Sequence, residues 1–233
     1  MGSQRLPGKV LMSLGGKPLL QRCLERAMVS SHVRRVIVAT TRLPEDDCIV
    51  ALVQSIGCPC FRGSDADVLD RYYQCAKEVG AENIVRLTGD NPLIQPAIID
   101  RTVELFLDTS LDYACNRRPR SFPLGFDVEV FNFKSLETAW REARHPDWRE
   151  HVTPYIIQNP GKFLLGSVVA DEDQSGYRLT VDTLEDYLLC CEIYKRPELL
   201  TDCHLLLQFL RDNPKIAGLN AHIPQVQVSA RES

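Results

Sequence analysis

The sequence lacks any apolar run near the roughly 20 residues needed to span a bilayer, and its polar start is unlike a cleavable signal peptide. It also lacks an excess of positive charge, because 27 Lys and Arg residues stand against 31 Asp and Glu residues and give a formal net charge of −4. This balance gives no general electrostatic reason to bind nucleic acid or a membrane surface. We therefore expect a cytoplasmic protein in which a local basic site holds any anionic ligand.

Common metal and nucleotide motifs are missing as well. The nine cysteines are scattered, and the pair in CPC, residues 58–60, is separated by one proline rather than by the two residues of a zinc or redox pair. The sequence contains neither the Walker pattern GxxxxGK followed by Ser or Thr nor the dinucleotide pattern GxGxxG. We expect reduced thiols and no structural zinc.

What the sequence does contain is a regular alternation of strand and helix patterns. With 44% apolar and 25% charged residues, the composition is that of a folded protein. Strand patterns at 33–41, 58–63 and 83–92 alternate with helix patterns at 45–57, 67–80 and 96–108. The alternation predicts an α/β fold with a mostly parallel sheet.

The pattern changes after residue 115. A basic, proline-marked loop leads into an alternating strand within 116–133. Helix patterns at 134–144 and 148–158, strand patterns at 162–170 and 177–183, and two closing helices follow. We interpret residues 1–225 as one domain with a small antiparallel insertion, and residues 226–233 as a tail.

The opening stretch GSQRLPGK, residues 2–9, is a candidate anion site. Glycines such as Gly2 let backbone N–H groups approach an anion closely, Ser3 adds a hydroxyl, and Arg5 and Lys9 supply charge for a polyphosphate. This pattern indicates a nucleotide site. A solvated turn before a helix explains these residues equally well.

Two aspartates follow strand patterns and are candidate metal ligands. Asp90 lies in RLTGDNPLI and Asp182 in YRLTVDTLEDY, and ligands bind open α/β sheets at the carboxyl ends of the strands. Magnesium prefers hard oxygen ligands and often uses one or two carboxylates together with substrate phosphates. The alternative is that both acids cap local turns and helices, a role that Thr183 or the acids after it could also fill.

Carboxylates and arginines of the 116–133 segment are candidates for substrate contact. Asp127 and Glu129 lie two residues apart and so project from one face of a strand, where they could bind sugar hydroxyls or remain merely solvated. The loop before them carries three basic residues that either bind an anionic group or are plain surface charge: Arg117, Arg118 and Arg120. His151 lies within a helix pattern, which favours a structural or positioning role over that of a general base.

Six segments in order carry a resemblance to a known family: GSQRLPGKVL, RGSDADVLDRYY, RLTGDNPLI, FPLGFDVEVF, REHVTPYI and RLTVDTLEDY. Together they resemble the cytidylyltransferase family of sugar activators, and within it the branch of spore coat polysaccharide biosynthesis protein F. The resemblance covers residues 1–195. It implies a GT-A-like, Rossmann-related fold.

The resemblance also implies an activity. Members transfer CMP from CTP to a sugar or sugar acid and release pyrophosphate, in surface polysaccharide or glycan biosynthesis, with Mg²⁺ as cofactor. By analogy, we also expect a homodimer. The alternatives are a glycosyltransferase of the same fold that consumes a nucleotide sugar, and a catalytically weak protein that only binds nucleotide or sugar.

By position, the resemblance assigns roles to residues of this chain. The triphosphate loop would include Gly2, Ser3, Arg5 and Lys9, and Asp90 and Asp182 would hold the metal. Arg5, Lys9 and Asp90 would be the catalytic residues. The remaining assignments place Asp70 and Arg71 near nucleotide and sugar, and Asp127 and Glu129 toward the acceptor sugar.

The chain departs from the family pattern at its start. Members of this branch usually carry a hydrophobic strand and an arginine ahead of the triphosphate loop, whereas this sequence starts at the Met of that pattern. The resemblance therefore predicts that the first central strand is missing, through truncation or a misplaced start site. A second, milder departure is Leu184, where the family often has proline.

Overall fold

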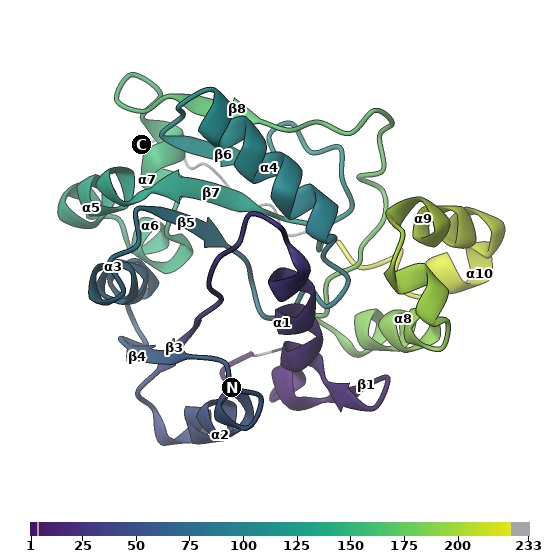
Figure 1. Cartoon of the computed structure of the whole chain (residues 1–233). Helices are drawn as coiled ribbons and strands as arrows, with labels where there is room; N and C mark the ends of the chain where they lie inside the picture. Colours follow the sequence, from purple (N-terminus) through teal and green to yellow (C-terminus); the bar gives the residue numbers. More distant parts are fainter. Residues whose placement is uncertain (4, 225–233) are drawn as a thin grey trace.

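The largest element of the fold is a four-stranded sheet with the order β5-β7-β6-β8 (Figure 1). The computed structural model describes residues 1–3 and 5–224, so the predicted tail at 226–233 lies outside the described residues. The strands of this sheet are β5 (Asn83–Arg86), β6 (Tyr113–Cys115), β7 (Glu129–Asn132) and β8 (Leu165–Ser167). Strand β7 is antiparallel to both β5 and β6, and β6 is parallel to β8.

The four-stranded sheet is mixed, because β5, β6 and β8 run in one direction and β7 runs in the other. The predicted parallel sheet with an antiparallel insertion is thus confirmed in part, and the antiparallel strand comes from the alternating FDVEVF segment, which returns between β5 and β6 and pairs with both. A separate parallel pair is formed by β3 (Val38–Thr41) and β4 (Cys60–Gly63), and β1 (Ser13–Leu14) forms a hairpin with β2 (Lys17–Pro18).

The described residues form helices α1 (Leu19–Val29), α2 (Asp47–Ser55), α3 (Val68–Glu78), α4 (Pro96–Asp108), α5 (Phe133–Glu142), α6 (Pro146–His151), α7 (Pro154–Gln158), α8 (Leu184–Tyr194), α9 (Cys203–Asp212) and α10 (Pro214–Ala217). Helix α4 packs on one face of the four-stranded sheet, and α3, α5 and α7 pack on the other. Short 3₁₀ helices are η1 (Lys9–Leu11), η2 (Pro44–Asp46) and η3 (Pro197–Leu200).

Alternate residues of the central strands point into two different cores. Ala114 and Val130 pack with residues of α1, α4 and α8, whereas Tyr113 and Phe131 pack with α3, α5 and α7. This is the period-2 alternation expected of a sheet covered on both faces. No helix among residues 1–3 and 5–224 has the length and apolar character needed to cross a membrane.

Several predicted elements are confirmed and two are wrong. Helix α4 spans the predicted 96–108 and begins at Pro96, whose fixed φ suits a first helical turn. The helix predicted at 148–158 is two helices, because Val152 adopts φ 71° between α6 and α7. The segment 177–183 forms no ladder, and only the bridge from Leu124 to Arg178 pairs it with a neighbouring segment.

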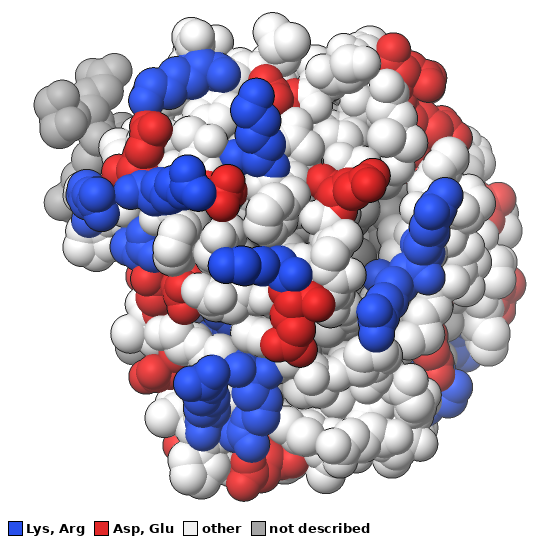
Figure 2. Space-filling model, turned by 60° about the vertical axis from the view of Figure 1, so that its left-hand side comes forward, with Lys and Arg blue, Asp and Glu red and all other residues white. Residues whose placement is uncertain are grey.

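A cleft of about 870 Å³ lies between β3 and β5, which belong to two different sheets. Its walls come from α1, α3 and α4 as well as from the two strands. The outer surface is less distinctive. On the face shown in Figure 2, Lys and Arg side chains alternate with Asp and Glu, so the described residues there form no broad basic patch.

Candidate active site

The glycine-rich opening segment turns the Lys9 side chain toward the interior. Gly8 has φ 71°, a left-handed conformation that glycine adopts without strain, and η1 begins at the next residue. As a result Lys9 is only 8% exposed. In the same segment the Ser3 hydroxyl accepts a hydrogen bond from the backbone of Leu6 at 3.3 Å, and Gly2 is exposed.

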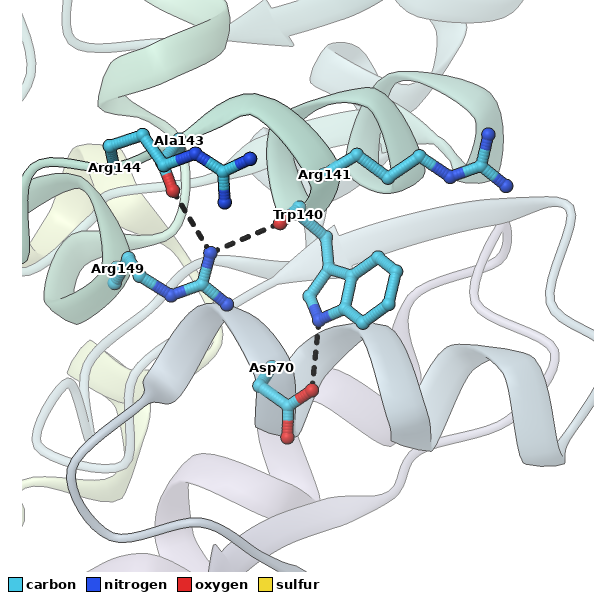
Figure 3. A pocket seen from close by; sticks show the side chains of 6 residues that line it. All are labelled: Asp70, Trp140, Arg141, Ala143, Arg144 and Arg149. Carbon is cyan, nitrogen blue, oxygen red and sulfur yellow. Dashed lines mark hydrogen bonds between the residues drawn. The ribbon is translucent and has the colours of Figure 1, made fainter.

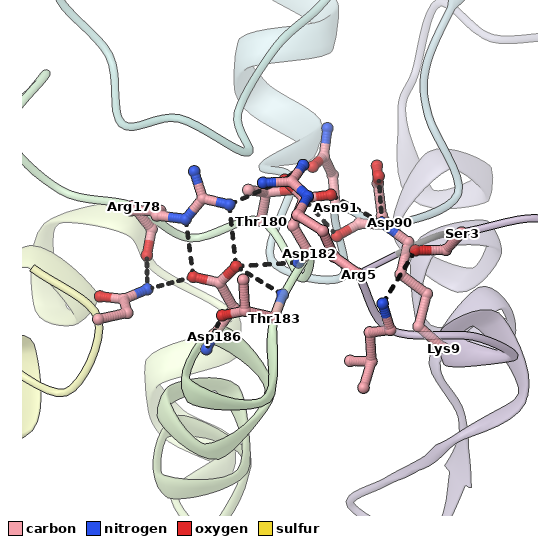
Figure 4. Close-up of polar contacts among 12 residues, drawn as sticks. Ser3, Arg5, Lys9, Asp90, Asn91, Arg178, Thr180, Asp182, Thr183 and Asp186 are labelled. Atoms are coloured by element: carbon pink, nitrogen blue, oxygen red, sulfur yellow. Dashed lines mark hydrogen bonds and ion pairs between the residues drawn. The ribbon is translucent and has the colours of Figure 1, made fainter. Parts of the chain in front are cut away.

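Lys9 brings together the two aspartates predicted as metal ligands (Figure 4). Its Nζ lies 2.8 Å from Asp90 Oδ2 and 2.8 Å from Asp182 Oδ1. The other oxygen of Asp90 accepts from the Thr88 hydroxyl at 2.5 Å, and Arg5 Nη2 lies 3.0 Å from Asp182 Oδ2. Residues separated by about 80 and 170 positions in the chain thus converge on one ammonium group.

The start of α8 explains why Asp182 is available for these contacts. Thr183 is the N-cap, and it forms a capping box with Asp186, so both cap positions are filled without Asp182. The capping alternative is therefore wrong for Asp182. Its two oxygens contact cations instead: Lys9, Arg5 and Arg178.

Behind Asp182 lies a buried polar network. Arg178 Nη2 contacts Asp182 at 2.8 Å, and the same guanidinium makes two bonds to Asp186, at 2.8 and 2.9 Å. The Asn220 amide donates to Asp186 Oδ1 at 2.7 Å and to the Arg178 carbonyl at 2.9 Å. Asp186 is fully buried and Asn220 is 2% exposed, so this network fixes Asp182 from the protein interior.

The charges of the cluster balance one another. Burial opposes the charged form of Lys9, but Asp90 and Asp182 outweigh it and raise the pKa of the ammonium above its usual value. Burial likewise opposes ionisation of Asp182, but Lys9, Arg5 and Arg178 lower the pKa of its carboxyl below its usual value. At neutral pH the cluster thus holds paired charges rather than a bare acidic site.

The donor set at Asp90 and Asp182 fits a magnesium ion that also takes ligands from a substrate. Both are carboxylates, the oxygen ligands that Mg²⁺ prefers, and both lie within hydrogen-bond distance of one point in space. Over residues 1–3 and 5–224, no group of three or more His, Cys, Asp or Glu side chains could hold a metal ion. Phosphate or water oxygens would have to complete the coordination.

The predicted pair Asp70 and Arg71 lies apart from this cluster. Asp70 accepts from the Trp140 indole N–H at 2.8 Å and lines a pocket of about 490 Å³ with Arg149 of α6 and residues of α5 and the turn after it (Figure 3). Arg71 donates to the Ser64 carbonyl at 2.6 Å. Neither side chain has a polar contact with the Lys9 cluster in the described part of the chain.

Glu129 occupies a buried position, whereas Asp127 does not. Glu129 is 2% exposed and accepts from the Tyr113 and Thr153 hydroxyls at 2.7 and 2.6 Å, and from Arg117 at 3.1 Å. Arg86 contacts its second oxygen. This burial excludes the solvated-face interpretation for Glu129, whose carboxylate holds two arginines.

Asp127 is half-buried and pairs with Arg120 through two bonds of 2.7 and 3.1 Å. Arg118, in contrast, is exposed. His151 ends α6. The loop that carries Arg120 runs beside the segment that leads to Asp182, because Leu124 pairs with Arg178.

A family model for cytidylyltransferases matches residues 1–209. The chain belongs to the cytidylyltransferase family. The resemblance carried by the six motifs is thereby confirmed.

Uncharacterized protein MJ1063 of Methanocaldococcus jannaschii is 42% identical over 227 residues, which cover 96% of this chain and 92% of that protein. Spore coat polysaccharide biosynthesis protein SpsF of Bacillus subtilis is 34% identical over 226 residues, 93% of each chain.

The structure of a cytidylyltransferase from Leptospira borgpetersenii is also similar, with a TM-score of 0.89 and 35% identity over 97% of this chain and 95% of that one. The α/β fold of this cytidylyltransferase family member is therefore that of known nucleotidyltransferases. Membership supports nucleotidyltransferase activity for the chain.

Sequence reasoning did not select three residues of the polar network beside Asp182 for the candidate site: Arg178, Asp186 and Asn220. Arg178 and Asp186 lie four residues on either side of Asp182, inside a motif that was already singled out. Asn220 follows α10 and has no local signal, because only the return of the chain after α10 brings it to Asp186.

Replacing Asn220 with alanine is expected to raise the KM for CTP about tenfold if Asp182 holds a metal with the nucleotide, because side chains that orient metal-ligating groups typically contribute 10- to 100-fold to metal affinity or activity. We expect a smaller change in kcat. The thermal midpoint of the variant is measured in parallel to detect a loss of stability. The exposed His222 provides a control, since His222→Ala lies two residues away and should change neither constant. An Asn220→Ala enzyme with unchanged KM would contradict a positioning role for the amide.

Proposed function

We propose that this protein transfers CMP from CTP to a hydroxyl of a sugar or sugar acid and releases pyrophosphate, in the synthesis of a surface polysaccharide or glycan. The observation that carries the proposal is the junction of Lys9 with Asp90 and Asp182, at 2.8 Å each, formed by three segments that match the family. Cationic and carboxylate groups at one point suit a triphosphate and its counter-ion.

Lys9 and Arg5 act on the triphosphate in this proposal. Both now neutralise Asp182, and a bound triphosphate offers them stronger anionic partners. The glycines of the loop let Gly2 and Ser3 approach phosphate oxygens with backbone N–H groups. Arg178 stays on Asp182 and Asp186, so the carboxylate keeps its orientation when Lys9 turns toward phosphate.

Asp90 and Asp182 would hold a magnesium ion when CTP is bound. Such an ion neutralises phosphate charge and favours displacement at phosphorus. Thr88 fixes one oxygen of Asp90, and the backbone N–H of Val181 donates to the Asp90 carbonyl at 2.9 Å, so the two ligand-bearing segments are tied together.

At the α-phosphorus of CTP the reaction forms one bond and breaks one. The acceptor oxygen bonds to the α-phosphorus of CTP, the bond from that phosphorus to the bridging oxygen breaks, and pyrophosphate leaves while the hydroxyl proton passes to solvent. No covalent enzyme intermediate is needed, so the residues contribute positioning and charge. Arg120 with Asp127 would meet the acceptor, Glu129 would position Arg117 beside them, and Asp70 with Arg71 would lie farther along nucleotide and sugar.

The test is release of pyrophosphate from each of the four nucleoside triphosphates with a panel of sugars and sugar acids, with and without Mg²⁺. We expect pyrophosphate with CTP, one acceptor class and the metal, and a CMP-sugar as the second product. Hydrolysis of a nucleotide sugar without pyrophosphate would support a glycosyltransferase instead. Nucleotide binding without turnover across the panel would support a protein that only binds.

A further inference from the structure

A pocket of about 490 Å³ lies between the start of α3, the end of α5 and α6, apart from the Lys9 cluster. Six residues line it: Asp70, Trp140, Arg141, Ala143, Arg144 and Arg149 (Figure 3). Three of them are arginines, and the proposed transfer gives none of the three a role. The pocket therefore holds polar and aromatic groups that the candidate active site does not account for.

The indole of Trp140 gives the pocket a rigid apolar wall. The ring stacks on Tyr73, with 4.1 Å between ring centroids and 13° between ring planes. Its N–H donates to Asp70 Oδ1 at 2.8 Å, and Gln74 donates to the same oxygen at 3.0 Å. These contacts fix the ring and the carboxyl group before a ligand arrives, which lowers the entropic cost of binding. The nonpolar face of a ligand ring can pack on such an indole.

Asp70 and Arg149 keep hydrogen-bonding groups for a ligand. Arg149 Nε donates to Asp67 at 2.6 Å, and Nη1 donates to the carbonyls of Trp140 and Ala143 at 3.0 and 3.1 Å. Over the residues that the structure describes, Arg149 Nη2 and Asp70 Oδ2 have no hydrogen-bond partner. One of these groups donates and the other accepts, so together they suit a ligand with several hydroxyl groups.

Arg144 supplies a positive charge without a counter-ion. Asp67 pairs with Arg149 at 2.6 Å, and Glu137 pairs with Arg141 at 2.9 Å. The exposed Arg144 side chain, in contrast, makes no hydrogen bond or ion pair with any residue of 1–3 and 5–224. A guanidinium group binds a carboxylate or a phosphate through two parallel hydrogen bonds. One acidic group on the ligand would therefore satisfy the remaining cation of the pocket.

We propose that this pocket binds a saccharide unit that carries one acidic group, either a carboxylate or a phosphate. The acidic group would pair with Arg144, hydroxyl groups would bond to Asp70 and Arg149, and the nonpolar face of the sugar ring would pack on Trp140. This subsite would give Asp70 a ligand other than the sugar that receives CMP. The proposal goes beyond the proposed transfer and does not rest on it.

The test is equilibrium binding followed by tryptophan fluorescence. The chain has two tryptophans, and Trp140 lines the pocket, so the emission reports on its occupancy. The probes are glucuronate and glucose 6-phosphate, which distinguish a carboxylate from a phosphate. Glucose, inorganic phosphate and alanine are the references for a neutral sugar, a bare ion and an amino acid. We expect saturable binding of at least one acidic sugar, at least tenfold tighter than binding of any reference.

Three variants locate the bound sugar. Arg144→Gln is expected to weaken the affinity for the acidic sugar about tenfold, because it removes a hydrogen bond between charged groups. Arg211→Gln is the matched control, since Arg211 is an exposed arginine of α9 outside the pocket, and it should bind as the wild type does. Arg120→Gln alters the loop proposed to meet the acceptor and should also keep the wild-type affinity.

The absence of saturable binding with both acidic sugars would overturn the proposal. Phosphate or alanine that binds as tightly as the acidic sugar would also overturn it, because the pocket would then select an ion or an amino acid. Wild-type affinity in Arg144→Gln would exclude the pocket, and weaker binding in Arg120→Gln would place the sugar at the acceptor position instead. None of these measurements includes CTP, so failure here is distinguishable from failure of the proposed function.

Discussion

Replacing Lys9 with alanine is expected to reduce kcat/KM for CTP by about 10²- to 10³-fold, because in the proposed reaction the variant lacks the buried cation that acts on the triphosphate. Lys9 is buried and has both aspartates at 2.8 Å, so water cannot easily replace its charge. The measurement is pyrophosphate release at saturating acceptor. Lys17 supplies a matched control, because it is exposed and pairs with Glu25 on the surface, so Lys17→Ala should retain the rate.

A second readout of the same variant needs no acceptor. Without the ammonium, Asp90 and Asp182 lose a shared counter-charge, so in Lys9→Ala the affinity for Mn²⁺ without nucleotide should rise even though catalysis falls. Mn²⁺ binding followed by electron paramagnetic resonance measures this change. An unchanged rate would contradict the proposal that Lys9 acts on the triphosphate, and Mn²⁺ affinity that does not increase would contradict the proposal that Asp90 and Asp182 hold the metal.

Local features of the fold could be predicted from the sequence because they depend on local patterns. The bounds of α4 follow from Pro96 and from apolar residues that recur with the period of a helix. Gly57 and Gly80 follow the ends of α2 and α3 and have the positive φ that favours glycine at such positions. The position of β7 could not be predicted in this way. Its alternating pattern indicates a strand, but pairing with β5 and β6 at once depends on contacts between distant segments.

The candidate site shows the same division. Lys9, Asp90 and Asp182 could each be selected from a local motif, but only Asp90 follows a strand, β5, so the rule that ligands bind beyond strand ends does not account for their convergence. The buried partners of these residues could not be selected. Glu129 carries the same signature as a surface carboxylate, and only the packing of Tyr113, Thr153 and two arginines around it reveals a buried ion network.

Replacing Glu129 with glutamine is expected to destabilise the fold by about 3–5 kcal/mol at pH 7, because Arg86 and Arg117 would lose the anion that compensates both. For a chain of this size, that corresponds to a thermal midpoint lower by roughly 10 °C. The matched control is Glu142→Gln on the surface, whose pairing with the exposed Lys162 should leave the thermal midpoint nearly unchanged.

The pH dependence of the Glu129 effect has a definite sign. Burial disfavours the ionised carboxyl, but Arg117, Arg86 and the two hydroxyls outweigh it and lower the pKa of Glu129 to about 2, from an ordinary value of 4.5. The unfolded chain therefore takes up this proton first, so the stabilisation is complete above pH 4.5 and is lost as the pH falls toward 2. Urea unfolding at pH 7 and pH 3 should show the gap between wild type and Glu129→Gln narrowing at the lower pH. A gap of constant size would mean that the ionised carboxylate is not what holds the two arginines.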